Sequence, residues 1–136
     1  MLTARYIMTP EIRYINVKDS IAKAARRILG EGVGSLIVVD ENVSPIGIVT
    51  KRDIIRAILF EKFNSDEPVE KIMSKPLITI DADAQIEEII NTMIKYNISH
   101  LPVKENGKII GMISDQDLME YLKDLLDIIK KKLGEQ

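Results

Sequence analysis

The chain has 136 residues, with 19 Lys and Arg residues against 21 Asp and Glu residues and a formal net charge of −2. It has no cysteine and one histidine, so its composition excludes disulfides, thiolate metal ligands, a cysteine nucleophile and a zinc site built from several histidines. The near-zero charge and the 4% aromatic content argue against nucleic-acid binding. No stretch suits a signal peptide or a membrane span, so we expect a cytoplasmic binding module without membrane contact rather than an enzyme.

The sequence contains an internal repeat with an offset of 65 residues, which becomes 64 after a one-residue slip at a turn. In this repeat, Ile7-Met8-Thr9 aligns with Ile72-Met73-Ser74, and residues 46–53 align with residues 110–117. A unit of about 60 residues has a marginal core, so we expect the two units to pack as a pseudo-twofold pair. The predicted domains are 1–63 and 71–125, with a connector at 64–70 and a helical tail at 126–136.

The first half predicts the element order β-α-β-β-α. Apolar residues spaced i, i+3, i+4, i+7 and i+8 indicate a helix with Asp19 as its N-cap and the glycines of 30–34 at its end. A hairpin around the turn at 41–45 and a second helix follow. The predicted ranges are strands 12–15, 35–39 and 46–49, and helices 21–29 and 53–63.

The second half predicts the same order, which places the chain in the α+β class with α/β-type layers. Its first helix has Asp83 as the predicted N-cap and ends at Tyr96-Asn97. Its predicted ranges are strands 77–80, 100–103 and 109–113, and helices at 86–94 and from 117 onward. We expect both helical stripes to lie in the core: Ile21, Ala24, Ala25, Ile28 and Leu29, and Ile86, Ile89, Ile90, Met93 and Ile94.

The last helix is amphipathic and extends beyond the repeat. Its apolar positions are Leu118, Leu122, Leu125, Leu126, Ile129 and Leu133, and it ends in three lysines at 130–132, which suit a helix C-terminus. Two interpretations stay open: a solvated tail, or a helix that packs on a partner subunit.

Each half contains the motif Gly-x-x-Thr/Ser-x-x-Asp between a strand and a helix, at Gly47–Asp53 and Gly111–Asp117. Thr50 and Ser114 are natural N-caps, and an acidic residue three positions later suits the first helical turn. The same arrangement suits a ribose-phosphate, because a helix N-terminus attracts anions and a carboxylate accepts hydrogen bonds from ribose hydroxyls. The spacing leaves both interpretations open.

The whole pattern resembles a tandem pair of cystathionine-β-synthase (CBS) domains. The resemblance covers about residues 2–125 and rests on the doubled element order, on the two motifs, and on Ile7-Met-Thr-Pro10, Ile72-Met-Ser-Lys-Pro76 and Ser99-His-Leu-Pro-Val103. It implies a stand-alone regulatory module that binds AMP, ADP, ATP, S-adenosylmethionine or a similar adenosine-type ligand in the cleft between the repeats. It also implies a homodimer that signals to a separate effector protein, with no cofactor, no catalytic residue and no metal ligand.

The resemblance implies roles for individual residues. Asp53 and Asp117 would hold ribose hydroxyls, Thr50 and Ser114 would lie beside the ribose or phosphate, and His100 would face phosphates. Tyr14 stands where the second half has Thr79, a departure that narrows the pocket or adds a stacking ring. The adenine pocket and its apolar wall would be formed by Ile12, Tyr14, Leu36, Val38, Leu77, Thr79, Leu101, Pro102 and Val103.

Two candidate features have more than one interpretation, and a third motif does not fit the function that it suggests. Lys51 and Arg52 at a helix start suit phosphate contact, or form a solvated face. His100 faces a phosphate, or is a partly buried histidine that bonds to backbone. Gly30-x-Gly32-x-Gly34 does not fit a dinucleotide fingerprint, because it follows a helix and precedes a strand.

The sequence therefore supports three functions. The first is a non-catalytic sensor of an adenosine-type ligand. The second is a constitutive interaction scaffold in which the repeated Asp and Thr/Ser residues act only as helix caps. The third is a small enzyme that uses His100.

Overall fold

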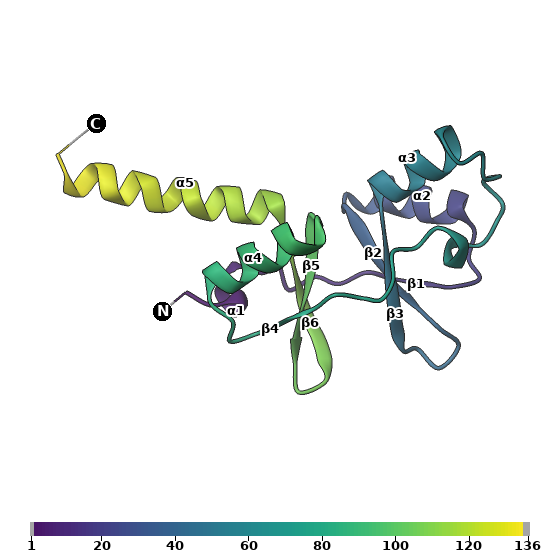
Figure 1. Ribbon diagram of the computed structural model, residues 1–136, viewed down its shortest axis with the longest axis horizontal. Helices are drawn as coiled ribbons and strands as arrows, with labels where there is room; N and C mark the ends of the chain where they lie inside the picture. The colour runs from purple at the N-terminus through teal and green to yellow at the C-terminus, as the bar shows by residue number, and fades with distance from the viewer. Residues whose placement is uncertain (1, 135–136) are drawn as a thin grey trace. The chain divides into compact units, whose positions relative to one another are not determined.

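The computed structural model describes residues 2–134 and divides the chain into two compact units (Figure 1). The continuous unit consists of residues 12–78, and the split unit consists of residues 2–11 together with 79–134. These units differ from the predicted domains, which begin at residues 1 and 71. The difference arises because residues 2–11 pack with the second half of the chain.

The continuous unit contains a three-stranded sheet and two main helices. The sheet has the order β1-β2-β3, with β1 parallel to β2 and β2 antiparallel to β3. An isolated bridge from Ser74 to Ile48 adds a short pairing at the free edge of β3. The elements are β1 (Tyr14–Asn16), α2 (Ile21–Glu31), β2 (Ser35–Val39), β3 (Pro45–Thr50), α3 (Lys51–Leu59) and the 3₁₀ turn η1 (Val69–Lys71).

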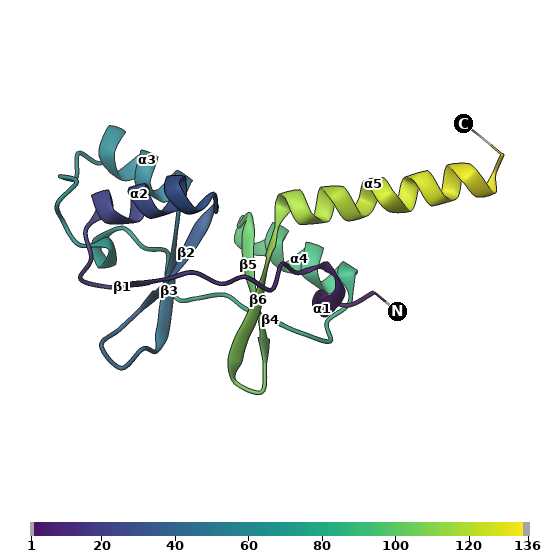
Figure 2. The same cartoon turned by 180° about the vertical axis from the view of Figure 1, so that it is seen from behind.

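The split unit repeats this arrangement with the sheet order β4-β5-β6. The matching bridge at the edge of β6 joins Thr9 to Met112, so it comes from the N-terminal segment. Figure 2 shows that segment running alongside the unit. The elements are α1 (Ala4–Ile7), β4 (Ile80–Asp81), α4 (Ile86–Tyr96), β5 (His100–Glu105), β6 (Lys108–Ser114) and α5 (Asp115–Lys132).

The split unit is a circular permutation of the continuous unit, and two backbone hydrogen bonds that hold the closing segment of each unit correspond. In the continuous unit, Val69 N donates to Asp19 O and Ser74 N donates to Ile48 O, both at 2.8 Å. The split unit has the equivalent bonds from Ala4 N to Ala84 O at 2.8 Å and from Thr9 N to Met112 O at 2.9 Å. The turn and edge pairing that close each unit therefore come from the segment that opens the other repeat.

Two repeated glycines allow this closing segment to approach the sheet. A Cβ added at Gly47 would lie 2.8 Å from Met73 Sδ and 2.9 Å from the backbone oxygen of Ser74. A Cβ added at Gly111 would overlap Met8 Sδ and would lie 3.0 Å from the backbone oxygen of Thr9. The glycine of the motif is thus explained by close backbone packing within each unit.

Each unit buries the apolar residues of its strands and one stripe of its helices. In the continuous unit the core includes Ile15, Ala24, Ile28, Leu36, Val38, Val49 and Val69. Helices α2 and α4 end at Gly32 and Asn97, both in the left-handed conformation, as predicted. The predicted α+β class, the two repeats and the C-terminal helix are confirmed.

Several predicted details are wrong. The first strand of each half starts later than predicted, at Tyr14 and Ile80, and the N-caps of α2 and α4 are Ser20 and Gln85 rather than Asp19 and Asp83. The Asp19 carboxylate instead accepts from the backbone N–H of Asn16. The last residues of the predicted core stripes, Leu29 and Ile94, are exposed on their helices.

The predicted boundary between the second domain and a tail at 125–126 falls inside α5, which is one continuous helix. Residues 135–136 of that predicted tail lie outside the described residues. Among residues 2–134, none of the helices has the length and apolar character that crossing a membrane requires.

Candidate functional site

Each unit gathers its predicted polar residues at one edge of its sheet. This edge is formed by the ends of the strands, and it differs from the free side of an outer strand described above. In the continuous unit, β1 and β2 begin at this edge, whereas β3 ends there and leads into α3. Thr50 is paired with Ser35, and Tyr14 is paired with Ile37. Because the N-terminus of α3 opens at the same edge, its dipole adds a positive partial charge there.

The first motif forms a complete capping box at the start of α3. The Asp53 Oδ2 atom accepts from the Thr50 backbone N–H at 2.9 Å and from the Thr50 hydroxyl at 3.1 Å. In return, Thr50 Oγ1 accepts from the Asp53 backbone N–H at 3.2 Å. Asp53 is only 7% exposed, so these bonds compensate for the burial of its charge.

Two further groups approach the Asp53 carboxylate. The Ser74 hydroxyl donates to Oδ1 at 3.3 Å and to Oδ2 at 3.4 Å, and Arg56 Nη1 lies 3.7 Å from Oδ1. Both carboxylate oxygens of Asp53 are therefore in use within the continuous unit.

The second motif forms the same capping box at the start of α5, with fewer neighbours. Asp117 Oδ2 accepts from the Ser114 backbone N–H at 2.8 Å, and Ser114 Oγ accepts from the Asp117 N–H at 3.1 Å. Asp117 is half-buried, and within the described residues its Oδ1 atom has no hydrogen-bond partner. The capping interpretation is therefore confirmed at both motifs, and Asp117 keeps one oxygen for another donor.

The other polar candidates lie at the same edges. His100 begins β5, is paired with Ser114 across the ladder, and has Ser99 Oγ 3.2 Å from its Nδ1. Lys51 and Arg52 are exposed in the first turn of α3, and within the described residues neither forms a salt bridge. The second motif has Asp115 and Gln116 at these positions, so the edge of the continuous unit is more positive.

The residues predicted to form the adenine pocket fall into two groups. Tyr14 is exposed, whereas Ile12, Leu77 and Thr79 are half-buried and precede the strands rather than lying in them. The five predicted wall residues of β2 and β5 are fully buried: Leu36, Val38, Leu101, Pro102 and Val103. In the continuous unit, Leu36 and Val38 belong to the core, so the edge residues offer the surface that a ligand could contact. All nine roles stay predictions.

Ser74 is a site residue that sequence reasoning missed. In the sequence repeat, Ser74 aligns with Thr9, and both lie in the segment that opens a half. This alignment was the only sequence feature that pointed to Ser74. The segment gains its role through the fold, because it closes the edge of β3 and thereby brings the Ser74 hydroxyl to Asp53.

A charged cluster fixes the N-terminal segment to the split unit, away from the capping boxes. Arg5 donates hydrogen bonds to the Glu105 carboxylate and, at 3.2 Å, to Asp83. The hydrogen bond from Arg5 lowers the pKa of Glu105 below its ordinary value, and the pKa of Arg5 is raised by the same partners. This cluster has a structural role, since it ties residues 4–7 to β5.

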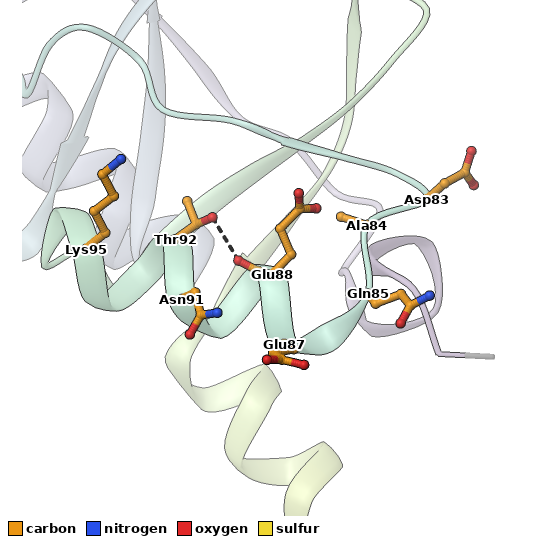
Figure 3. A pocket seen from close by; sticks show the side chains of 8 residues that line it. All are labelled: Asp83, Ala84, Gln85, Glu87, Glu88, Asn91, Thr92 and Lys95. Atoms are coloured by element: carbon orange, nitrogen blue, oxygen red, sulfur yellow. Dashed lines mark hydrogen bonds between the residues drawn. The ribbon is translucent and has the colours of Figure 1, made fainter.

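A groove of about 550 Å³ follows α4 within the split unit (Figure 3). Three carboxylates and Lys95 line it, and the Thr92 hydroxyl donates to the Glu88 carbonyl oxygen at 2.8 Å. Its lining is Asp83, Ala84, Gln85, Glu87, Glu88, Asn91, Thr92 and Lys95, and it contains none of the predicted site residues. Residues 2–134 also contain no group of three His, Cys, Asp or Glu residues that could hold a metal ion.

Comparison with curated proteins gives relatives that cover most of this chain. An uncharacterized protein of Methanopyrus kandleri is 33% identical over 123 residues, which are 87% of this chain and 63% of that protein. An uncharacterized 17.7 kDa protein of Acidianus ambivalens is 33% identical over 120 residues, which are 88% of this chain and 72% of that protein. The chain spans only 31% of a Methanocaldococcus jannaschii protein to which it is 33% identical.

One relative is an enzyme, a homoserine O-acetyltransferase of Methanococcus vannielii. It is 34% identical over 113 residues, and the match covers 82% of this chain but 23% of that protein. The shared region is thus a small part of that enzyme.

Solved structures share the fold. An uncharacterized conserved protein of Pyrococcus horikoshii is 32% identical, with a TM-score of 0.82 over 88% of this chain and 90% of that chain. A CBS domain pair crystallised with 5′-methylthioadenosine and S-adenosyl-L-methionine is 26% identical, with a TM-score of 0.81 over 91% of this chain and 98% of that chain.

The family comparison agrees with the repeat found in the sequence. The CBS domain profile matches twice, at residues 4–60 and 69–124. The two matches follow the sequence repeat. Each compact unit instead contains the opening segment of the other repeat. The chain belongs to the CBS domain family and contains a tandem pair of these domains.

Proposed function

We propose that this protein is a non-catalytic sensor that binds an adenosine-type ligand and signals to a separate effector protein. The observation that carries the proposal is the Asp117 carboxylate at the N-terminus of α5, with one oxygen fixed by the capping box and the other without a partner among the described residues. A carboxylate held in this way is suited to accept a hydrogen bond from a ribose hydroxyl. The structural relative that contains two adenosine compounds supports the ligand class.

Asp117 is the better candidate for the ribose contact. At Asp53 a ribose would compete with the Ser74 hydroxyl and with Arg56 for the carboxylate oxygens. At Asp117 the Oδ1 atom is available without breaking a hydrogen bond of the unit. We therefore infer that the split unit binds ribose more tightly than the continuous unit.

The continuous unit is better suited to phosphate. Lys51 and Arg52 are exposed at the N-terminus of α3, where the helix dipole also favours an anion. The split unit has Asp115 and Gln116 instead, and Asp115 would repel a phosphate. A ligand with a phosphate chain thus favours the continuous unit, and one without phosphate, such as 5′-methylthioadenosine, favours the split unit.

Isothermal titration of ligand-free protein tests the proposal. Mass spectrometry of a denatured sample first shows that no nucleotide has co-purified, and the protein is then titrated with AMP, ATP, S-adenosylmethionine and 5′-methylthioadenosine. We expect at least one to bind, and we expect Asp117→Ala to reduce the affinity for a ligand without phosphate at least tenfold. Absence of binding by all four, from folded protein, would contradict the proposal.

A constitutive scaffold is the second candidate, and the complete capping boxes favour it. The boxes explain why Thr50, Asp53, Ser114 and Asp117 occur at this spacing without any ligand. A scaffold predicts that Asp117→Ala lowers the stability of the protein and leaves no ligand affinity to lose. The titration therefore separates the two functions.

We propose that the protein is a homodimer that uses the exposed faces of its helix pairs. The continuous unit exposes Leu29 on α2 and Ile55 on α3, and the split unit exposes Ile94 and Met119 at the equivalent positions. Exposure of large apolar side chains at both copies of the same positions suits a protein interface. Light scattering on Leu29→Asp and Ile94→Asp variants tests this, because both substitutions would lower the mass of a dimer held by these faces.

A further inference from the structure

Helix α5 extends beyond the unit in which it begins. Leu118 is 8% exposed and packs in the split unit, whereas every described residue from 122 to 134 is exposed. Figure 1 shows this segment as the yellow helix that leaves the end of β6 and continues past the remainder of its unit. Water thus surrounds about three helical turns that are rich in leucine and isoleucine.

The exposed apolar residues of α5 form a regular stripe. Met119, Leu122, Leu126, Ile129 and Leu133, here called the α5 seam, are separated by three, four, three and four residues. Alternating spacings of three and four residues are the pattern of a two-stranded coiled coil. Met119 is 67% exposed and Leu122 is 42% exposed, so the seam lacks a covering element among the described residues.

The charges of α5 are distributed unevenly along the helix. Its first nine residues carry Asp115, Asp117 and Glu120 against Lys123, which sum to −2. Its last nine residues carry Asp124 and Asp127 against the three lysines at 130–132, which sum to +1. A parallel pair of such helices would place the two lysine clusters together, whereas an antiparallel pair places each cluster beside the acidic start of the other helix.

We propose that the α5 seam binds the α5 seam of a second copy of this chain in an antiparallel pair. One register pairs four of the five seam residues with one another and places Leu133 opposite Asp115 of the second copy. In it, Met119 lies opposite Ile129 of the second copy, and Leu122 lies opposite Leu126 of the second copy. The same register brings the lysines at the end of each helix to Asp115 at the start of the other. The pair requires no ligand, and the seam shares only Met119 with the helix faces that contain Leu29 and Ile94.

Light scattering of the full chain at low salt tests the pair. We expect Leu126→Asp and Ile129→Asp each to lower the mass of the assembled protein. Ile128→Asp is the matched control, because Ile128 is exposed on the same helix but lies outside the seam. Circular dichroism confirms that each variant keeps its fold. A monomeric wild-type protein, or a mass that neither seam substitution changes, would overturn the proposal.

Disulfide trapping tests the orientation, since the chain has no cysteine of its own. A mixture of Leu122→Cys and Leu126→Cys proteins is expected to form the mixed disulfide under mild oxidation. In the antiparallel register the two copies of residue 129 are about 15 Å apart, because they are separated by ten residues at about 1.5 Å each. Ile129→Cys alone should therefore form no disulfide dimer. Efficient trapping of Ile129→Cys without the mixed product would show a parallel pair and overturn the antiparallel arrangement.

Discussion

The two capping boxes have the same sequence pattern and different surroundings. Around Asp53, the Thr50 hydroxyl, Ser74 and Arg56 occupy the carboxylate, and only 7% of the residue is exposed. Around Asp117, the backbone N–H of Ser114 is the one donor among the described residues, and the side chain is half-buried. The motif therefore determines how the helix starts, whereas the closing segment of each unit determines whether the carboxylate can also bind a ligand.

The units also differ in how the chain forms them. The continuous unit closes with residues that follow its own helix α3, but the split unit closes with the first residues of the chain. Arg5, Asp83 and Glu105 reinforce the closure of the split unit with a charged cluster. No equivalent ion pair holds η1 to the strand hairpin of the continuous unit within residues 2–134. The comparison leads to four predictions on stability.

The largest expected effect comes from the repeated glycine. Gly47→Ala brings a Cβ within 2.9 Å of the Ser74 backbone oxygen, so we expect a loss of about 1–3 kcal/mol in the free energy of unfolding. Gly111→Ala should have a loss of similar size, because its Cβ would also meet a Met side chain, that of Met8, and would lie 3.0 Å from the Thr9 backbone oxygen. Urea denaturation measures both, with Gly30→Ala as the control, since its Cβ would meet nothing within 4 Å. Equal stability of Gly47→Ala and wild type would contradict the account.

Loss of the capping carboxylate should have the next largest effect. Asp53→Ala and Asp117→Ala each remove a capping box, at a cost of about 0.5–2 kcal/mol. Asp53→Ala should cost more, because it also leaves Ser74 and Arg56 without their partner. Denaturation midpoints of the two variants and of their Asn counterparts measure this order. A larger loss at Asp117 would contradict the difference between the two boxes.

Ser74→Ala should have a smaller effect on stability and make the two boxes alike. Its hydrogen bonds to Asp53 are long, so we expect a loss of about 1 kcal/mol or less. The same change frees the Asp53 carboxylate and should strengthen ligand binding at the continuous unit. Thr9→Ala, at the equivalent position, is the control. Comparison of ligand titrations for the two variants checks the prediction, and weaker binding by Ser74→Ala would show that Ser74 helps to hold the ligand.

The smallest effect concerns pH. The hydrogen bond from Arg5 lowers the folded-state pKa of Glu105, so its stabilising contribution is fully present above the unfolded value and is lost as the pH falls through the folded value. The stability difference between wild type and Glu105→Gln should thus be constant near neutral pH and decrease below about pH 4.5. Thermal denaturation at a series of pH values measures it, with Glu87→Gln as the control. A difference that grows on acidification would contradict the assigned sign.

Much of the fold could be predicted from the sequence, because it depends on local patterns. The repeat, the helix ends at Gly32 and Asn97, and the hairpins follow from periodicity and turn chemistry. The exchange of the opening segments could not be predicted, since it depends on which repeat residues 2–11 pack against. The exposure of Leu29 and Ile94 also escaped prediction, because an apolar stripe on a helix does not distinguish a core from an interface.

The candidate site was predictable to a similar extent. The spacing from Thr50 to Asp53 predicts a cap, and the structure contains one. The contact between Ser74 and Asp53 joins residues 21 positions apart, and it forms only because the closing segment pairs with β3. The burial of Leu36 and Val38 follows from the helices that cover β2, which the strand sequence alone does not reveal.

Asp117 is the carboxylate that we propose to bind ribose in an adenosine-type sensor. Its most direct test is titration of 5′-methylthioadenosine into ligand-free wild type, Asp117→Asn and Asp53→Asn, since Asn keeps an oxygen for the cap and removes the charge. We expect the affinity to fall at least tenfold in Asp117→Asn and to change little in Asp53→Asn. Equal affinity of Asp117→Asn and wild type, with binding intact, would contradict it.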